Sequence, residues 1–331
     1  MIHTVKSISS IPLVILAGPT AIGKSTLAMK LAKKLYTDII SADSAQVYRD
    51  LNIGTAKPSV KEQKEIKHHL LDLINPDQQF SAADFQKAAG ETIHNLWNSG
   101  KLPLMVGGTG LYIRAVTDCY AFGKKRSSAA LRDSLNKEAD LVGLDQIYIK
   151  LKEVDPDAAL KIHPNDRRRI IRALEVYNLE GRPISKQAAE TEPDTSPYAC
   201  YFYCLTMERE KLYKRIENRV DTMIEKGFLD EVKTLRQDGY SCDTPGMQIL
   251  GYRQLCNYLQ GNASWDETVS EIKKETRNLA KRQLTWFRRL KNIKWIEISG
   301  EKDFEKELNA ALEIIYAEVK ELIPSQANNT F

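Results

Sequence analysis

The sequence predicts an α/β fold in which helices flank a parallel sheet and an α-helical insertion interrupts the chain. Leu13–Ala17 is an apolar run typical of a buried strand, and it leads through a glycine-rich loop into a helix that starts near Lys24. Short apolar runs and helical patterns then alternate, as in parallel sheets built from strand–helix–strand units. Residues 120–198 show helical periodicity and no convincing strand, which indicates the insertion.

Each further element is assigned from its own residues. Apolar, β-rich runs that we interpret as strands follow at residues 39–43, 68–74, 102–106, 200–206 and 293–298. Ser81 caps a helix that has Asp84 in its first turn and stops at Gly100. The C-terminal part is mostly helical, with helices expected at residues 209–226, 229–237, 248–260 and 266–290.

These elements predict a core and an inserted domain. Residues 1–119 and 199–331 are expected to form the sheet core with the C-terminal helices, and residues 120–198 the α-helical insertion. Residues 187–198 are polar and indicate a mobile linker back to the core, and residues 324–331 are expected to be disordered.

The composition is that of an ordinary globular protein. With 331 residues, the chain is long enough for one large α/β domain with an insertion or for two domains. Hydrophobic residues make up 42% and charged residues 28%. No apolar run is long enough to span a bilayer, and the first ten residues lack the apolar core of a signal peptide. We therefore expect a cytoplasmic protein that does not enter a membrane.

The five cysteines are scattered along the chain, at positions Cys119, Cys200, Cys204, Cys242 and Cys256. None forms a CxxC pair, and an odd, scattered set indicates free thiols in a reducing compartment. Cys200 and Cys204 have no neighbouring pair of histidines or cysteines to complete a metal site, so we interpret them as residues on one face of a buried strand.

The loop after the first strand carries a phosphate-binding pattern. Residues 18–25 read GPTAIGKS and fit G-x-x-x-x-G-K-[ST]. Such a loop turns its backbone amides toward a polyphosphate, and the following helix adds its positive end. Lys24 can reach between two phosphates, and the hydroxyl of Ser25 can bind Mg²⁺. The fold class is therefore a P-loop NTPase-like sheet, although the motif by itself does not specify ATP.

Asp43 ends the second predicted strand. The carboxyl ends of parallel strands share one edge of a sheet, so Asp43 should lie beside the phosphate loop. It could activate a hydroxyl in a small-molecule kinase, take a proton during transfer from a diphosphate ester, or only position Mg²⁺ or cap a loop. The strand at residues 102–106 ends in Gly-Gly-Thr, with no acidic residue of the kind that holds the metal in kinases.

A first cluster of positive charge opens a predicted helix in the insertion. The net charge of +4 neither indicates nor excludes nucleic-acid binding, so we consider how the charges are distributed along the chain. Arg167, Arg168 and Arg169 lie in the first turn and Arg172 follows, against the preference of helix dipoles for acidic residues there. An external polyanion explains this arrangement, and pairing with nearby carboxylates or a solvated face is the alternative.

A second cluster lies in the last long helix of the core. Lys273, Arg277 and Lys281 are spaced by four and share one face. Trp286 and Phe287 follow, and we assign them to the core rather than to base stacking. Two basic helical patches outside a phosphate-binding core indicate RNA, bound through its backbone phosphates.

Several segments together resemble the bacterial tRNA dimethylallyltransferase family, the isopentenyl-transferases. In order from about residue 12 to 290, they are AGPTAIGKSTLA, SADSAQVYRDLNIGTAKP, HHLLDLINPDQQFSAADF, LMVGGTGLYIRAV, HPNDRRRIIRALEVY, GYRQ and AKRQLTWFR. The resemblance implies transfer of a dimethylallyl group from dimethylallyl diphosphate to N6 of adenine 37 in tRNAs that read codons starting with U. The implied partners are tRNA and dimethylallyl diphosphate, with Mg²⁺ as cofactor and a monomeric chain.

The resemblance also implies roles for individual residues. Asp43 would be the general base on N6, with Thr20, Thr109 and Arg219 near the reacting centre. The implied diphosphate-binding residues are Gly18, Pro19, Thr20, Ala21, Ile22, Gly23, Lys24 and Ser25, with Ser25 on Mg²⁺. The implied tRNA-binding residues are Asp43, Ser44, Ala45, Gln46, Thr109, Arg132, Arg168, Arg169, Ile170, Ile171, Arg172, Lys281, Arg282 and Gln283. The alternatives are a small-molecule kinase and an RNA-binding protein that uses the loop as a nucleotide switch.

Overall fold

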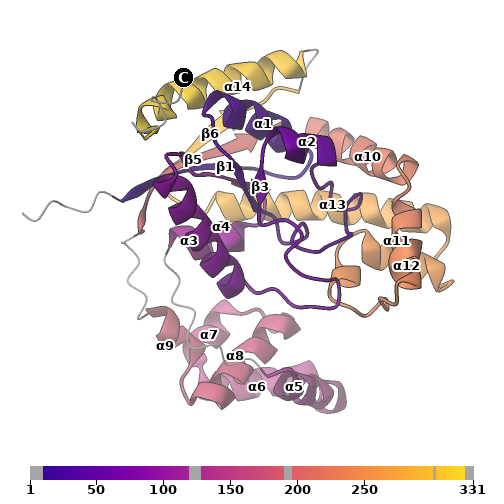
Figure 1. Ribbon diagram of the computed structural model, residues 1–331. Helices are drawn as coiled ribbons and strands as arrows, with labels where there is room; N and C mark the ends of the chain where they lie inside the picture. The colour runs from indigo at the N-terminus through magenta and orange to yellow at the C-terminus, as the bar shows by residue number, and fades with distance from the viewer. Residues whose placement is uncertain (1–9, 119–127, 190–195, 301–302, 325–331) are drawn as a thin grey trace, which may run out of the picture. The chain divides into compact units, whose positions relative to one another are not determined.

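The chain divides into two compact units. The computed structural model describes residues 10–118, 128–189, 196–300 and 303–324 (Figure 1). One unit comprises residues 1–117 and 196–331, and the other comprises residues 118–195. We name the first the core unit and the second the helical unit, and their boundaries lie close to those expected for the inserted domain.

The core unit contains a six-stranded sheet in the order β3-β2-β4-β1-β5-β6. Every pairing in it is parallel, which confirms the predicted α/β class. The strands are β1 (Ile11–Ala17), β2 (Ile39–Ala42), β3 (His68–His69), β4 (Leu104–Gly107), β5 (Tyr198–Thr206) and β6 (Ile293–Glu297). Gly107 is in register with both Ala17 and Ala42, so β1, β2 and β4 end side by side. Ligands of open parallel sheets bind at such an edge.

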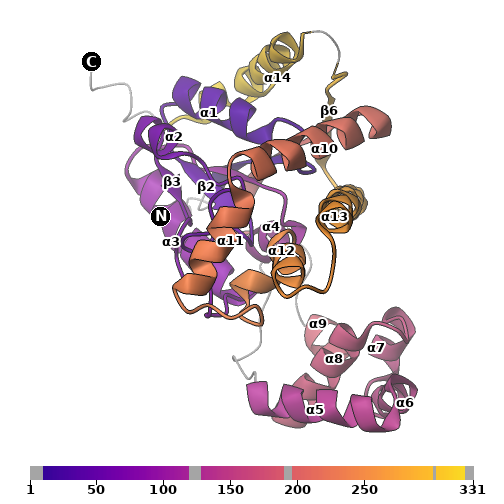
Figure 2. The same cartoon turned by 90° about the vertical axis from the view of Figure 1, so that its right-hand side faces the viewer.

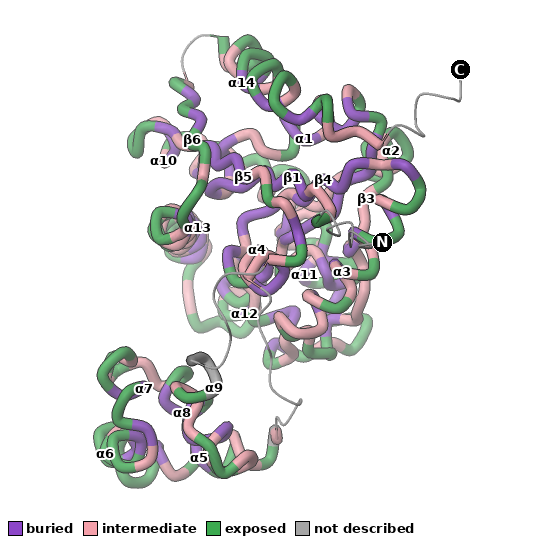
Figure 3. Tube along the Cα trace, turned by 90° about the vertical axis from the view of Figure 1, so that its left-hand side faces the viewer, coloured by how far each residue is buried: buried purple, intermediate pink, exposed green. Residues whose placement is uncertain are grey.

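Helices cover both faces of the sheet because side chains alternate along each strand. Leu13 and Ile15 of β1 are buried among residues of α3 and α4, whereas Val14 and Leu16 are buried among residues of α1 and α14. Figure 3 shows the strands as a buried layer between more exposed helices. The helices of the core unit are α1 (Lys24–Lys34), α2 (Val60–Glu65), α3 (Ala82–Asn98), α4 (Gly110–Thr117), α10 (Arg209–Glu225), α11 (Phe228–Gln237), α12 (Tyr252–Leu259), α13 (Trp265–Phe287) and α14 (Phe304–Val319).

Several elements differ from the sequence-based expectation, and three of them are instructive. The strand expected at residues 68–74 stops at His69, because Leu70 and Asp72 take positive φ angles of 64° and 54°. The helix expected from residue 248 begins only at Tyr252, after Gly251 with φ 92°. Helix α14 was not predicted, although its buried residues Leu308, Ala311, Ile315 and Val319 follow a helical spacing.

The helical unit consists of α5 (Ala129–Val142), α6 (Leu144–Val154), α7 (Pro156–Lys161), α8 (Arg167–Glu180) and α9 (Ile184–Ala189). Its core is built from fully buried residues that include Ile147, Leu151 and Ile170, and its described residues contain no strand. Helix α9 extends over residues 187–189, where a linker was expected, and residues 190–195 lie outside the described residues, as do residues 325–331. Among the helices that the structure describes, none has the length and apolarity needed to cross a bilayer.

The cysteines correct one expectation. Cys242 and Cys256 form a disulfide with a Cα–Cα distance of 5.8 Å, so they are not free thiols. The bond joins α12 to the segment that precedes it. Cys200 and Cys204 lie outside this disulfide and both belong to β5, as expected, but only Cys204 is buried and Cys200 is exposed. Cys119 lies outside the described residues.

Candidate active site

A cavity of about 400 Å³ opens at the carboxyl edge of the sheet in the core unit. Residues 20–26 of the phosphate loop and helix α1 line one side, and Asp43 and Gln46 line another. Gly107, the last residue of β4, and Gly108 contribute to the wall. The structure therefore brings Asp43 and the phosphate loop together, as the parallel sheet predicted.

The phosphate loop curls around the side chain of Lys24. Ala21 and Gly23 adopt positive φ angles of 65° and 101°, and α1 starts immediately afterwards. The Lys24 ammonium donates a hydrogen bond to the carbonyl oxygen of Pro19 at 2.6 Å. A β-carbon at position 23 would lie 2.6 Å from the ring of Phe304, so the loop also needs glycine there to fit beneath α14. The local fold thus holds an ammonium group inside a ring of backbone.

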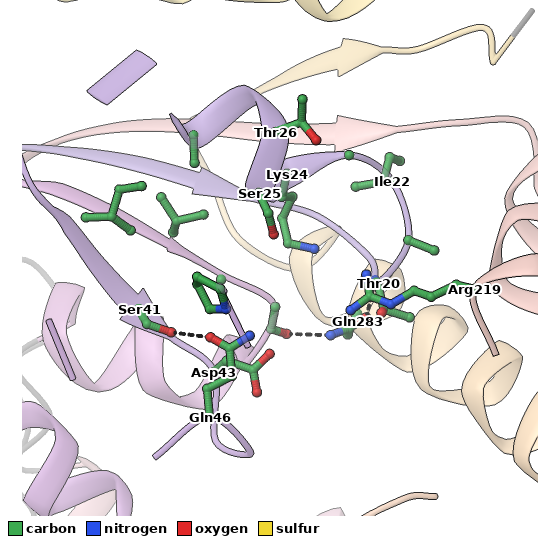
Figure 4. Close-up of a pocket in the computed structure, with 18 of the residues that line it drawn as sticks. Thr20, Ile22, Lys24, Ser25, Thr26, Ser41, Asp43, Gln46, Arg219 and Gln283 are labelled. Carbon is green, nitrogen blue, oxygen red and sulfur yellow. Dashed lines mark hydrogen bonds between the residues drawn. The ribbon is translucent and has the colours of Figure 1, made fainter. Parts of the chain in front are cut away.

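Three charged side chains surround one space in the cavity. Burial, followed by the nearby Arg219 guanidinium, lowers the pKa of Lys24 to about 8, against the opposing effect of Asp43. Burial also lowers the pKa of Arg219, while the Asp43 carboxylate acts in the other direction. Figure 4 shows Lys24, Arg219 and Asp43 around this space. Two half-buried cations with one carboxylate favour a multivalent anion as the ligand.

Helix α10 supplies one wall, most of which the sequence-based expectation missed. Arg215, Asn218 and Thr222 line the cavity together with the expected Arg219. The Arg215 Nε donates to the carbonyl oxygen of Ala21 at 3.0 Å, and its guanidinium lies 3.7 Å from the ring centre of Phe304. The spacing of these four polar residues, at steps of three and four, was a usable signal in the sequence because it marks one helix face.

Asp43 and Thr109 shape the loop that follows β2. Asp43 Oδ1 accepts a hydrogen bond from the N–H of Ala45 at 2.9 Å. The Thr109 hydroxyl oxygen accepts one from the N–H of Ser44 at 3.0 Å, and its own N–H donates to Ala42. Asp43 lines the cavity, whereas Thr109, Ser44 and Ala45 are absent from its lining and act on the loop through these hydrogen bonds.

The side-chain amide of Gln46 has a fixed orientation in the cavity wall. Its Oε1 accepts a hydrogen bond from the Ser41 hydroxyl at 3.0 Å. Its Nε2 donates to the carbonyl oxygens of Thr55 and Ala56 at 3.3 and 3.4 Å. Both ends of the amide are therefore engaged, so its donor and acceptor atoms cannot exchange places without loss of hydrogen bonds.

His68 is a further lining residue that the sequence did not predict. Its Nδ1 lies 2.8 Å from the carbonyl oxygen of Ile66, which can only accept, so Nδ1 carries the hydrogen. Burial lowers the pKa of His68, which favours the neutral ring. The neutral ring leaves Nε2 as a hydrogen-bond acceptor.

Helix α13 reaches the cavity through Gln283. Gln283 Oε1 accepts a hydrogen bond from the N–H of Thr20 at 2.9 Å, and Nε2 donates to the carbonyl oxygen of Gly108 at 3.1 Å. The expected group of Lys281, Arg282 and Gln283 is therefore divided. The two cations are exposed, and the glutamine joins the phosphate loop to the turn after β4.

The second predicted basic patch is smaller than expected. Lys273 and Arg277 pair with Asp221 and Glu217 of the neighbouring helix α10, at 2.7 and 2.6 Å (Figure 2). These two cations hold α13 against α10, whereas Lys281 is exposed. That the three form an RNA-binding face stays a prediction. Phe287 is fully buried, as the assignment to the core required.

The arginines of the helical unit have different environments. Arg167 pairs with Asp140 at 2.6 Å, Arg169 with Asp166 at 3.3 Å, and Arg172 with the buried Glu175 at 2.7 Å. Arg132 Nε also lies 3.2 Å from a Glu175 carboxylate oxygen. Carboxylate pairing, the alternative considered from the sequence, thus accounts for most of this cluster.

Arg168 is the exception in the first turn of α8. Its side chain is exposed and has no ion-pair partner among the residues that the structure describes. Ile170 and Ile171 were also expected to bind tRNA, but they are 0% and 4% exposed in the core of the helical unit. Their side chains are therefore unavailable to a ligand in this structure, and contact of these positions with tRNA stays a prediction.

The oxygen atoms that the cavity offers suit Mg²⁺ only when a phosphate ligand is bound as well. No group of three His, Cys, Asp or Glu side chains among the described residues could hold a metal alone. The exposed hydroxyl of Ser25 and the carboxylate of Asp43 offer hard oxygen atoms in the same cavity. Mg²⁺ is commonly bound by one or two such groups together with phosphate oxygens and water.

Comparison with known proteins agrees with this geometry. The sequence profile of the IPP transferase family matches residues 46–290. A tRNA dimethylallyltransferase of Natranaerobius thermophilus is 47% identical over 290 residues, which cover 87% of each chain. One of Carboxydothermus hydrogenoformans is 48% identical and covers 89% of this chain and 94% of its own.

Solved structures give the same result. The full-length tRNA isopentenylpyrophosphate transferase from Bacillus halodurans superposes with a TM-score of 0.69 and 40% identity, covering 94% of this chain and 97% of that one. A eukaryotic dimethylallyltransferase acting on tRNA superposes with a TM-score of 0.80 and 27% identity, covering 95% and 81%. From the phosphate loop, its neighbouring carboxylate and these relatives together, we conclude that the chain belongs to the IPP transferase family.

Proposed function

We propose that this protein transfers the dimethylallyl group of dimethylallyl diphosphate to N6 of adenine 37 in tRNAs that read codons starting with U. The observation that carries the proposal is the composition of the cavity. Asp43 is the one carboxylate among the described residues that line it, and it faces Lys24 and Arg219. Such a site can retain a diphosphate and accept one proton, which are the two tasks of this transfer.

The reaction requires one bond to form and one to break. The N6 nitrogen attacks C1 of the allyl group, the bond from C1 to the diphosphate oxygen breaks, and the diphosphate leaves with the bonding pair. Lys24, Arg219 and the amides of the phosphate loop stabilise that departing charge. Asp43 takes the proton that N6 loses. Mg²⁺ on Ser25 and the phosphates would offset further negative charge.

The adenine must leave the anticodon stack to reach such a site. We propose that Asp43 and Gln46 meet the extruded base, with Thr109 and Ser44 supporting them. For the tRNA backbone, the exposed cations Arg168, Lys281 and Arg282 are the candidates. Phosphate contacts of this kind position an RNA without reading its sequence.

The decisive experiment analyses the product by mass spectrometry. Protein, Mg²⁺ and dimethylallyl diphosphate are incubated with an anticodon stem-loop that contains adenines 36 and 37, and the nucleosides are then separated. We expect one dimethylallyl group on adenosine 37 and none when guanosine replaces it. ATP-dependent phosphorylation of a metabolite, without any modified adenosine, would support the kinase alternative instead.

A further inference from the structure

The segment that Gln46 contacts is held by a carboxylate outside the cavity. Residues 52–54 turn tightly between the loop after β2 and helix α2, and their three N–H groups point at Glu231 in the first turn of α11. Glu231 Oε2 accepts from Asn52 at 3.0 Å and from Ile53 at 2.7 Å, and Oε1 accepts from Gly54 at 3.2 Å. One side chain thus satisfies three successive backbone donors.

Glu231 is itself fixed by helix α12. The hydroxyl of the fully buried Tyr252 donates to Glu231 Oε1 at 2.6 Å. The rings of Tyr252 and Phe228 meet edge to face, with 4.9 Å between their centres. A β-carbon at position 54 would lie 2.1 Å from the Phe228 ring and 2.6 Å from that of Tyr252, so the turn is pressed directly onto this pair. Helices α11 and α12, adjacent in Figure 2, therefore form the packed surface on which residues 52–54 lie.

The same segment leads into the carbonyl groups that orient Gln46. Thr55 and Ala56 follow the turn directly, and their carbonyl oxygens accept the two hydrogen bonds from Gln46 Nε2. The Thr55 hydroxyl donates back to the carbonyl oxygen of Leu51 at 2.6 Å, which closes the turn. A continuous set of hydrogen bonds therefore runs from Glu231 through the backbone to the amide in the cavity wall.

We propose that Glu231 is a positioning residue for base recognition, acting on the extruded adenine through residues 52–56 and Gln46. This inference rests on the proposed function, because it assigns Gln46 to the base. Without the carboxylate, the turn loses its charged hydrogen-bond acceptor, and the carbonyl groups of Thr55 and Ala56 shift. The side-chain amide of Gln46 then no longer has one fixed orientation in the cavity wall. The diphosphate end of the cavity has no contact with Glu231 among the described residues, so it should be unaffected.

The test compares Glu231→Gln with Asp230→Asn, which removes an exposed acidic charge from the same helical turn. We expect Glu231→Gln to raise both the KM and the Kd for the anticodon stem-loop by roughly tenfold, the size of a lost charged hydrogen bond. The affinity for inorganic diphosphate and the KM for dimethylallyl diphosphate should stay within about twofold, as for a neutral surface change. Asp230→Asn should leave all four quantities unchanged.

A double-mutant cycle separates positioning from general damage. In a Gln46→Ala background, Glu231→Gln should raise the KM and the Kd for the stem-loop by less than about a further twofold, because the amide that it orients is already gone. An equal loss in both backgrounds, or a parallel loss of diphosphate affinity, would overturn the proposal. If Glu231→Gln does not fold, Tyr252→Phe removes one hydrogen bond to the carboxylate while keeping the ring, and it should give the same selective loss.

Failure of the proposed function would be recognised separately. A wild-type enzyme that transfers no dimethylallyl group refutes that function, whatever the variants do. Stem-loop affinity, measured by fluorescence anisotropy without any donor substrate, still tests Glu231 in that case. Wild-type affinity in Glu231→Gln would then refute the positioning role by itself.

Discussion

The side chain of Gln283 accepts a hydrogen bond from the backbone N–H of Thr20 at 2.9 Å, although 263 positions separate the two residues in the sequence. The same side chain donates to Gly108. Helix α13 therefore holds the phosphate loop at a defined distance from the turn after β4. This contact would keep the loop in its binding conformation before a ligand arrives, which lowers the cost of ordering it.

Replacing Gln283 with leucine should weaken the binding of inorganic diphosphate by roughly tenfold, because the loop loses its distant support. Isothermal titration calorimetry measures this directly. Thr285→Ala, an exposed change one half-turn further along α13, is the matched control and should bind normally. Tighter binding by Gln283→Leu would show instead that the freed N–H of Thr20 turns toward the ligand.

Diphosphate binding should weaken as the pH rises through 8. The pKa of Lys24 is lowered to about 8, mainly by burial, so its ammonium loses its proton above that pH and no longer attracts the anion. Between pH 7 and pH 9 the protonated fraction falls by roughly tenfold, and the dissociation constant should rise accordingly. Lys24→Met supplies the control, since it should bind weakly and lack this component of the pH dependence. A wild-type profile that matches the Lys24→Met profile contradicts the assignment.

Asp43→Asn should lower kcat by roughly 10²- to 10⁴-fold, the usual contribution of a general base. Asparagine retains the Oδ1 atom that accepts the N–H of Ala45, so the loop after β2 should keep its conformation. Stem-loop affinity should therefore change little. Single-turnover measurements with saturating substrates isolate the chemical step, and a rate near that of the wild type would exclude Asp43 as the base.

Arg168→Ala should weaken stem-loop binding and reduce the slope of log K against log salt by about 0.7–0.9, the value for one lost phosphate contact. Arg168 is exposed and lacks an ion-pair partner among the described residues, so its removal disturbs no internal contact that the structure shows. Arg167→Ala is the comparison, because Arg167 pairs with Asp140. It should affect the stability of the helical unit more than the salt dependence. An unchanged slope in Arg168→Ala would identify a solvated residue.

The disulfide between Cys242 and Cys256 should stabilise the core unit by about 3 kcal/mol, the value expected for closing a loop of this length. A reductant should therefore lower the midpoint of thermal unfolding of the wild type. The double variant Cys242→Ala, Cys256→Ala should have a lower midpoint that no longer responds to reductant. If reductant does not change the unfolding midpoint of the wild type and mass analysis finds both cysteines as thiols, the bond does not exist in solution.

Local features of this protein could be predicted from the sequence, because neighbouring residues determine them. The glycines of the phosphate loop, the capping box of Ser81 and Asp84, and the burial of Leu13 all follow from short-range patterns. The position of Asp43 required only the rule that parallel strands end at one edge.

Contacts between distant segments could not be predicted in this way. Lys273 and Arg277 look like a ligand-binding stripe until α10 supplies their carboxylate partners. The support that Gln283 gives to Thr20 likewise depends on how α13 crosses the sheet. The burial of the Ile170 side chain could not be foreseen either, because a resemblance covers a whole segment, whereas a helix divides that segment between surface and core.

The ring of Phe304 lies 2.6 Å from where a β-carbon at position 23 would be, and it also stacks on Arg215. The phosphate loop is therefore bounded by a side chain that lies far from it in the sequence. The shape of the proposed cradle depends on how two distant segments fold together, and the eight-residue motif does not specify it alone.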